Sequence, residues 1–353
     1  MANISVYLDS DVCRWQLDES NLVVKRYFDL DQFERDQNIK KVSVFHTPYP
    51  YLKVKKDFEK RVDRAFNASH QLVILTSELH DETVDFILNH SHPKILHLVC
   101  GTVDGIETKK WMDWFITSTD FYKQNPILET LTPYALKEKT FDILLGQQKY
   151  HRNIIYNYIK QQQLDHRVVM TYLNNLNKIV EGVNNNGWIW PAGDLKLLDK
   201  DLRGTISQVL WQGQDLTLSQ VVPINIYNQT AYSIVAETKF SNHYSFYTEK
   251  TVKPILGKRL FLAFSGQHFL QNLRSMGFKT FDGIIDESYD LVSDIDLRGK
   301  LIIQQMEYLF NQDQHKILES VKPIAEHNYK ILMETPWHEL SQFEFKTAIT
   351  NIS

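Results

Sequence analysis

Short apolar runs alternate with segments of helical spacing along the first 136 residues. Several of the runs lack polar alternation, as strands do when both faces of a parallel sheet are covered. The strands predicted in this way are Ile4–Leu8, Val42–Phe45, Leu72–Leu75 and Ile95–Val99. Helical spacing lies between them at Asp57–Phe66 and Glu82–His90, and the aromatic-rich stretch Lys109–Tyr122 is also expected to be helical. This alternation predicts a doubly wound α/β domain.

A second series of the same kind begins at Phe141–Gly146, an apolar run that ends on a glycine. The later segments are a helix at Asn153–Gln163, strands at Arg167–Thr171 and Tyr232–Ala236, a helix or irregular segment near Leu216–Val222, the apolar segments Thr251–Leu256, Leu260–Phe264 and His268–Met276, and helices at Leu297–Gln312 and Ala325–Met333. A chain of 353 residues is long for one hydrophobic core. We therefore predict an α/β fold of two Rossmann-like domains that face each other across a cleft. Their expected bounds are 1–136 and 137–324, with a C-terminal helix in 325–353 that crosses back to the first domain.

Composition narrows the class of protein without identifying it. The formal net charge of −4 gives no general attraction to nucleic acid. Cys13 and Cys100 are far apart and lack metal-ligand spacing, which fits isolated thiols in a reducing compartment. No window approaches the ~20 apolar residues needed to cross a bilayer, and the first residues do not resemble a signal peptide. These features predict a cytoplasmic protein.

The first group of residues with chemical potential follows the run that ends on Gly146. Lys149 and Arg152 lie at the expected start of a helix, where backbone N–H groups and the helix dipole favour an anion. An arginine side chain can also hold phosphate oxygens with two parallel hydrogen bonds. A diphosphate would suit this position, although a solvated basic helix start would give the same pattern.

The second group combines Glu237 with the sequence Thr248-Glu249-Lys250 and with Lys253. A carboxylate at a helix N-terminus can accept hydrogen bonds from two vicinal hydroxyls, such as those of a ribose. Lys250 and Lys253 lie on neighbouring helix positions, where they could meet phosphates or water. The alternative is that Thr248 and Glu249 form a helix cap and nothing more.

These two groups belong to a longer stretch that resembles known proteins. The stretch contains Ser233–Thr238, Phe246–Thr251, Gly277–Phe281 and Asp286–Asp290. It resembles the donor-binding half of glycosyltransferase-like proteins from tailed phages and some bacteria, and it is more distantly similar to fucosyltransferases, whose Thr-Glu-Lys motif contacts the nucleotide sugar. Phe141–Arg152 is similar to the opening of the C-terminal domain in phage DNA glucosyltransferases. The resemblance covers roughly residues 140–295 and extends weakly into the first half at Thr76–His80 and Trp111–Phe115.

The resemblance implies a GT-B hexosyl- or pentosyltransferase that needs no metal and no cofactor, with a UDP- or GDP-sugar as co-substrate. It would be located in the host cytoplasm if a phage encodes it. The donor-binding set that it implies is Gly146, Lys149, Arg152, Glu237, Thr248, Glu249 and Lys250. In this set Glu249 would bind the ribose, Arg152 and Lys250, with Lys149, would hold the diphosphate, and Glu237 would face the sugar or ribose. Asp294-Ile295-Asp296 has the spacing of a metal-diphosphate motif, but we expect it to cap a helix.

An inverting transfer requires a base that takes the proton of the acceptor hydroxyl. His46, Glu78 and Asp104 each follow a predicted strand of the first domain and are the candidates. Each of them could equally be a loop cap, and a retaining enzyme would need no such base.

The acceptor is the least determined part of the prediction. A basic cluster in the first half could bind a nucleic-acid backbone, or it could be the solvated face of an amphipathic helix, because acidic residues interrupt it. The cluster consists of Lys53, Lys55, Lys56, Lys60, Arg61 and Arg64. The phage resemblance suggests a hydroxymethylated pyrimidine in DNA, flipped out of the stack. The alternatives are a glycan or lipopolysaccharide acceptor, and a nucleotide-sugar-binding protein without catalysis. Trp188, Trp190 and Pro191 could line a sugar pocket or anchor a loop.

Overall fold

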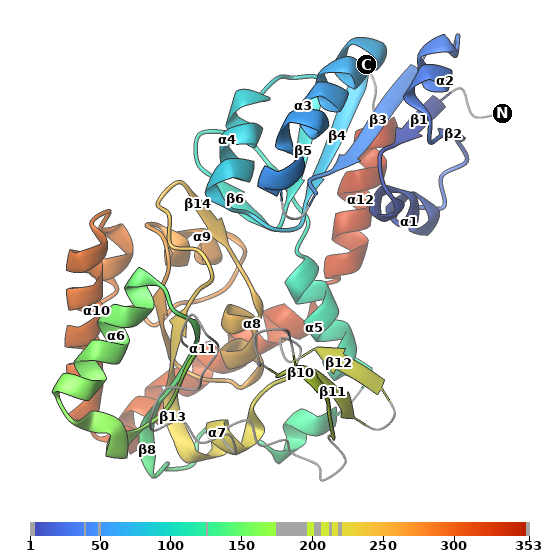
Figure 1. Cartoon of the computed structure of the whole chain (residues 1–353). Coiled ribbons are helices and arrows are strands. Elements are labelled where there is room, and N and C mark those ends of the chain that lie inside the picture. The colour runs from blue at the N-terminus through green and yellow to red at the C-terminus, as the bar shows by residue number, and fades with distance from the viewer. Residues whose placement is uncertain are drawn as a thin grey trace. The chain divides into compact units, whose positions relative to one another are not determined.

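The computed structural model describes residues 4–38, 40–48, 51–124, 126–173, 196–200, 206–211, 214–217 and 221–350. The chain divides into two compact units, Met1–Ile116 with Pro336–Ser353, and Thr117–Thr335 (Figure 1). The division falls at 116/117 and 335/336, whereas the sequence pattern placed it at 136/137 and 324/325. Each unit is a mixed α/β structure built on a parallel sheet. Trp188, Trp190 and Pro191 lie outside the described residues.

The first unit is built on a parallel sheet with the strand order β2-β1-β3-β4-β5-β7. Its strands are β1 (Ile4–Leu8), β2 (Lys25–Tyr27), β3 (Lys40–His46), β4 (Gln71–Thr76), β5 (Ile95–Val99) and β7 (Lys109–Lys110). The four strands predicted from apolar runs are confirmed, and β1 and β5 have the predicted bounds. The chain passes from β1 to β2 on one side and then to β3 on the other side of β1, so the strand order reverses between β1 and β3.

Helices cover both faces of this sheet. They are α1 (Asp11–Glu19), α2 (Leu30–Arg35), α3 (Tyr51–Ala68), α4 (Asp81–Asn89) and α12 (Trp337–Thr350). Val6 and Val44 point to the face covered by α1 and α12, where they share a core with Phe345. Tyr7 and Phe45 point to the opposite face, and the Phe45 ring packs on Phe58 of α3. The alternation along each strand therefore supplies two apolar faces, as the lack of polar alternation predicted.

The prediction of one helix over Lys109–Tyr122 is wrong at its start. Lys109 and Lys110 form β7 and pair with Leu98 and Val99 of β5, and the helix α5 extends only over Asp113–Gln124. The backbone of β5 offers hydrogen-bond partners along its free side, and two residues suffice to continue the sheet there. Pairing of this kind depends on a distant strand, so local helical spacing did not reveal it.

The second unit contains a parallel sheet with the order β15-β13-β8-β9. The strands of this sheet are β8 (Lys139–Gln147), β9 (Val168–Leu173), β13 (Thr230–Ala236) and β15 (Phe261–Phe264). The helices of the second unit include α6 (Tyr150–Gln161), α7 (Ile224–Gln229), α8 (Glu249–Leu256), α9 (Phe269–Ser275), α10 (Ile295–Phe310) and α11 (Gln314–Glu334). Phe141 of β8 packs on Phe310 of α10, whereas its neighbour Asp142 points to the face on which α7 and α8 lie. The chain continues from β8 to β9 on one side and then to β13 on the other, so the order also reverses between β8 and β13.

The remaining elements lie outside the two parallel sheets. They are β6 (Gly101–Val103), β14 (Tyr244–Phe246), β10 (Lys196–Lys200), β11 (Ile206–Trp211), β12 (Gln214–Thr217) and the 3-10 turns Pro126–Thr130, Leu164–Arg167 and Ser288–Leu291. β10, β11 and β12 form an antiparallel sheet. Leu216 therefore lies in a strand, where we expected a helix or an irregular segment. Asp294 caps α10 by accepting the N–H of Leu297 at 2.8 Å, as predicted.

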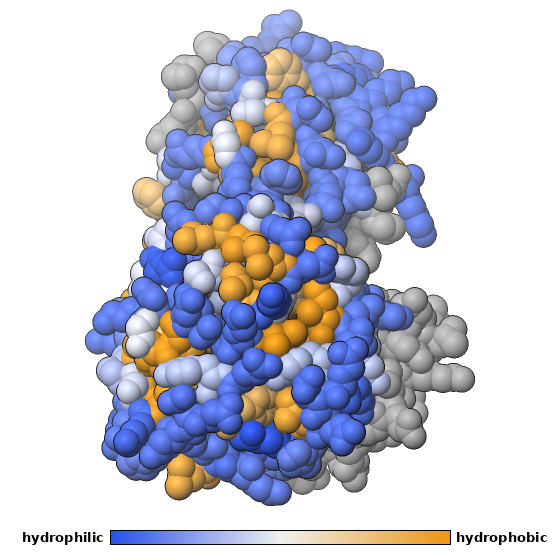
Figure 2. Space-filling model, turned by 90° about the vertical axis from the view of Figure 1, so that its left-hand side faces the viewer, coloured by the Kyte–Doolittle hydropathy of each residue, from blue (hydrophilic) through white to orange (hydrophobic). Residues whose placement is uncertain are grey.

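Polar residues cover most of the face drawn in Figure 2, with apolar side chains gathered in patches between them. Among the residues that the structure describes, no helix is both long enough and apolar enough to cross a membrane.

Two phenylalanines of α12 test whether this helix belongs to the core of the first unit. Phe345 is 1% exposed and Phe343 is 64% exposed. We expect Phe345→Ala to lower the free energy of unfolding by about 3–5 kcal/mol, because it removes a ring from a packed core. The same change at Phe343 should cost no more than about 0.5 kcal/mol. Urea unfolding of the two variants measures both values, and equal effects would contradict the placement of α12.

Candidate functional site

The turn from β8 into α6 brings two predicted cations to the end of β13. Arg152 is buried and donates hydrogen bonds from Nη2 to the carbonyl oxygens of Ala236 at 3.2 Å and Glu237 at 3.3 Å. Lys149, the N-cap residue of α6, donates from Nζ to the carbonyl oxygen of Thr238. Gly146 leaves room for this arrangement, because a Cβ there would come within 3.3 Å of Nη1 of Arg152. Lys149 and Arg152 therefore fasten α6 to the carboxyl end of β13.

His151 completes this junction as a neutral group. Its Nε2 lies 3.0 Å from the carbonyl oxygen of Glu237, and its ring packs against Phe240 and Phe264. Burial lowers the pKa of His151 to about 3, with the Arg152 charge acting in the same direction. The imidazole is therefore uncharged at neutral pH and donates to the carbonyl as a neutral ring.

The carboxylate of Glu237 joins β13 to α8. It is 0% exposed, and its two oxygens accept four hydrogen bonds from described residues of the chain. The donors are Thr248 N (3.2 Å), Thr248 Oγ1 (2.7 Å), Thr251 Oγ1 (2.6 Å) and Thr238 N (3.1 Å). A buried carboxylate is stable only when such donors replace its hydration. The structure thus places Glu237 beneath the surface, where its oxygens are bonded to groups of the protein itself.

Helix α8 begins directly above this carboxylate. Thr248 is its N-cap residue, and Oγ1 of Thr248 accepts the N–H of Lys250 at 3.2 Å. Glu249 pairs with Nζ of Lys250 at 2.5 Å. Burial raises the pKa of Glu249, but the ammonium groups of Lys250 and Lys253 outweigh this effect and hold the pKa below its usual value. Burial also lowers the pKa of Lys253 to about 8. A carboxylate and two amines thus lie within the first two turns of one helix.

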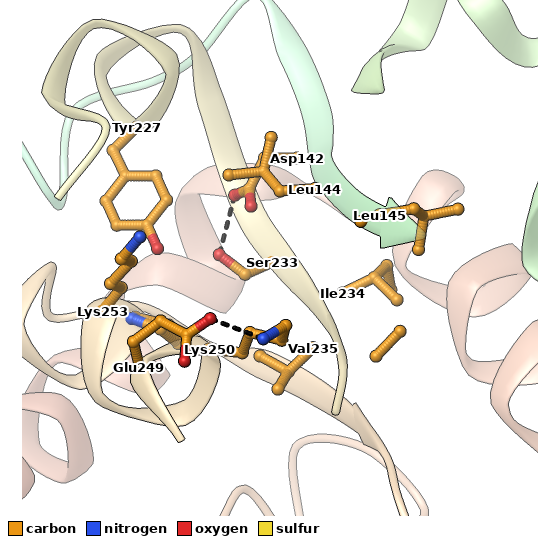
Figure 3. A pocket seen from close by; sticks show the side chains of 13 residues that line it. Asp142, Leu144, Leu145, Tyr227, Ser233, Ile234, Val235, Glu249, Lys250 and Lys253 are labelled. Atoms are coloured by element: carbon orange, nitrogen blue, oxygen red, sulfur yellow. Dashed lines mark hydrogen bonds and ion pairs between the residues drawn. The ribbon is translucent and has the colours of Figure 1, made fainter. Parts of the chain in front are cut away.

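These three side chains line a pocket of about 210 Å³ between α8 and the strands β8 and β13 (Figure 3). The walls are otherwise mostly apolar and consist of Leu144, Leu145, Gly146, Ile234, Val235, Ala236, Pro254 and the ring of Tyr227. Of the predicted donor residues, Gly146, Glu249 and Lys250 belong to this lining, and Lys149, Arg152, Glu237 and Thr248 do not. The pocket lies beside the strand pair at which the sheet order reverses, where open α/β sheets bind ligands.

The polar end of this pocket was not predicted from the sequence. Asp142 and Ser233 line it, and Nη2 of Arg259 pairs with Oδ1 of Asp142 at 2.9 Å. Both side chains of this ion pair are buried. The Arg259 guanidinium also donates to the carbonyl oxygens of Tyr227, Thr230 and Tyr232. In the sequence, the only local sign of this ion pair is Asp142 itself, a charged residue inside the apolar run Phe141–Leu145.

The candidate bases all lie in the first unit. His46 ends β3, is partly buried, and has its Nε2 3.0 Å from Oγ of Ser77, which follows β4. Burial lowers the pKa of His46, so the ring is neutral at pH 7. Glu78 follows β4, and its backbone carbonyl accepts a hydrogen bond from Thr83. Asp104 is exposed in the turn after β6.

The predicted basic cluster lies on α3, and acidic side chains of the same unit neutralise much of it. Arg61 pairs with Asp9 and Asp57. Arg64 pairs with Asp31 and Glu34, and Lys55 lies 3.8 Å from Glu59. Lys53, Lys56 and Lys60 are exposed. Half of the cluster therefore has carboxylate partners within this chain.

The sequence matches no protein-family model and no curated protein. Within the described ranges of the chain, no group of three or more His, Cys, Asp or Glu side chains is placed to hold a metal ion.

Substitution of the two neighbouring glutamates should separate their roles. We expect Glu237→Gln to lower the free energy of unfolding by about 2–3 kcal/mol, because an amide NH2 would face buried donors that need an acceptor. Glu249→Gln should cost less than about 1 kcal/mol, because Glu249 is partly open to the pocket and its ion pair with Lys250 is partly screened. Thermal unfolding of both variants makes the comparison, and a larger loss for Glu249→Gln would contradict these assignments.

Proposed function

We propose that this protein is a GT-B glycosyltransferase that moves a sugar from a nucleotide-sugar donor to an acceptor hydroxyl. The observation that carries the proposal is the grouping of Glu249, Lys250 and Lys253 on one wall of a pocket beside β8 and β13. This grouping offers an acceptor for ribose hydroxyls and cations for a diphosphate. In this proposal the second unit binds the donor, and the first unit presents the acceptor.

Each donor residue then has a specific task. Glu249 keeps a low pKa and stays ionised, so it can accept hydrogen bonds from both ribose hydroxyls. Lys250 and Lys253 stabilise the negative charge that develops on the diphosphate as it leaves. Lys149, Arg152 and Glu237 act indirectly, because they hold α6, β13 and α8 in the positions that shape the pocket.

The chemical step breaks the bond between the anomeric carbon and the diphosphate oxygen, and the electron pair leaves with the diphosphate. The acceptor oxygen forms the new bond to the anomeric carbon, and its proton passes to a base. Of the three candidates, His46 suits this task best, because it is neutral and Ser77 fixes its ring. A neutral imidazole takes up the proton and becomes the imidazolium.

A panel of donors and acceptors tests the function directly. The purified protein is incubated with UDP- and GDP-sugars, together with either hydroxymethylcytosine or hydroxymethyluracil DNA, or with lipopolysaccharide or oligosaccharide acceptors. Mass spectrometry should show a hexose or pentose added to one class of acceptor. Donor binding without any transfer or hydrolysis would indicate a nucleotide-sugar-binding protein, and the absence of donor binding would overturn the proposal.

Donor affinity should depend on the Glu249 carboxylate. We expect Glu249→Gln to weaken binding of the preferred nucleoside diphosphate by about 10- to 100-fold, because hydrogen bonds to a charged acceptor are lost. Glu319→Gln, on an exposed position of α11, is the matched control and should bind as the unchanged protein does. Isothermal titration calorimetry gives both affinities, and equal values would exclude Glu249 from the site.

The low pKa of Lys253 predicts a pH dependence of the same affinity. Since its ammonium loses its proton as the pH rises through about 8, nucleoside diphosphate binding should weaken by about 10-fold between pH 7 and pH 9.5. Lys253→Met should bind weakly at both pH values, and Lys300→Met, an exposed lysine of α10, should follow the unchanged protein. A flat profile for the unchanged protein would contradict the placement of Lys253 beside the ligand.

A further inference from the structure

The polar end of the pocket has a free acceptor in an otherwise apolar surrounding. Asp142 is 2% exposed and lines the pocket. Within the described residues, all three hydrogen bonds to its carboxylate end on Oδ1, from Arg259 (2.9 Å), Ser233 (2.7 Å) and Thr230 (3.5 Å). Oδ2 is therefore available to a ligand. Figure 3 shows Asp142 and Ser233 at one end of the pocket and Glu249 with Lys250 at the other.

The dimensions of the pocket suit one ring system. Its volume of about 210 Å³ is below the ~300–1,000 Å³ of sites that enclose a whole drug-sized ligand. Asp142 lies four residues before Gly146 along β8, which is about 13 Å at the usual rise of a strand. Helix α8 runs antiparallel to β8: its first residue, Glu249, lies at the end near Gly146, and Gly257, which follows the helix, lies beside Arg259, the partner of Asp142. A ligand that reaches from Glu249 to Asp142 must therefore be elongated, with its apolar ring between the two carboxylates.

We propose that this pocket holds the base of the nucleotide donor and that Asp142 selects guanine. The inference rests on the proposed function, in which Glu249 binds the ribose. Burial raises the pKa of Asp142, and the Arg259 guanidinium 2.9 Å away acts in the opposite direction. Paired with this cation, the carboxylate only accepts hydrogen bonds, so it matches a base edge that only donates. Guanine presents the N1–H and the 2-amino group side by side, and Oδ2 of Asp142, with its two lone pairs, can accept from both.

The other bases fit the same carboxylate less well. Uracil has one N–H between two carbonyl oxygens, which a carboxylate repels. Adenine presents an unprotonated ring nitrogen where guanine has N1–H, and hypoxanthine keeps N1–H but lacks the 2-amino group. The aliphatic walls and the Tyr227 ring contact all of these rings alike, so they add affinity without distinguishing the bases. Discrimination then comes from the Asp142 oxygen, in the way that buried polar groups reject partners that leave them unpaired.

The test compares nucleoside diphosphates that differ only in the base, using the unchanged full-length protein. Calorimetric titration with GDP, IDP, ADP and UDP should give the tightest binding for GDP. We expect a loss of about 10-fold for IDP and of about 100-fold for ADP and UDP. UDP or ADP binding as tightly as GDP would overturn the assignment of the base while leaving the glycosyltransferase proposal intact. If none of the four binds, the proposed function fails as well.

Asp142→Asn provides a second measurement on the protein side. The variant should lose about 10-fold or more in GDP affinity and little in UDP affinity, because an amide in place of the carboxylate removes an acceptor from the guanine edge. Asp142 also pairs with Arg259, so circular dichroism first establishes that the variant is folded. An equal loss for GDP and UDP would mean that Asp142 supports the pocket only structurally and would overturn the proposal. Should the variant not fold, the nucleotide series on the unchanged protein decides the question.

Discussion

The second unit depends on one buried carboxylate. Glu237 directly follows the strand β13, and its oxygens accept hydrogen bonds from the N–H of Thr238 and from the N–H and hydroxyl groups at the start of α8. Because a carboxylate without water needs all of these donors, the position of α8 relative to the sheet is closely specified. Glu249 follows the N-cap residue Thr248 directly. Its place beside the pocket is therefore a consequence of how Glu237 is satisfied.

A second set of bonds holds the other side of the same strand end. The cations of Lys149 and Arg152 and the neutral ring of His151 all reach the carbonyl oxygens of residues 236–238. Ala236 forms the last pair of β13 with β15, and Glu237 and Thr238 follow the strand. Side chains at the start of α6 donate hydrogen bonds to these three carbonyl oxygens. Residues of both α6 and α8 thus form hydrogen bonds at the carboxyl end of β13, beside the point at which the strand order reverses. These bonds give the pocket a defined shape.

The sequence was most informative where the structure depends on local chemistry. The runs at Ile4–Leu8 and Ile95–Val99 are strands with the predicted bounds, because both faces of the sheet are covered and every residue in them is buried or nearly so. The strand at Lys109–Lys110 was missed, because its partner β5 is brought beside it only by the fold. Residue type alone also did not distinguish Glu237 from Glu249. Both are acidic and close to the start of α8, but only the fold shows which of them meets four donors and which meets the pocket.

The ion pair of Asp142 and Arg259 is the feature that packing explains least. Two charges removed from water lose more hydration than their attraction returns unless many hydrogen bonds compensate, and an apolar pair of similar volume would often be as stable or more stable. Arg259 has these compensating bonds, to three carbonyl oxygens and two hydroxyls. Among the residues that the structure describes, Asp142 is bonded through one oxygen only, and it meets the pocket beside apolar walls. Its asymmetry makes sense if the second oxygen is kept for a ligand, with Arg259 present to oppose the rise in the pKa of Asp142 that burial causes.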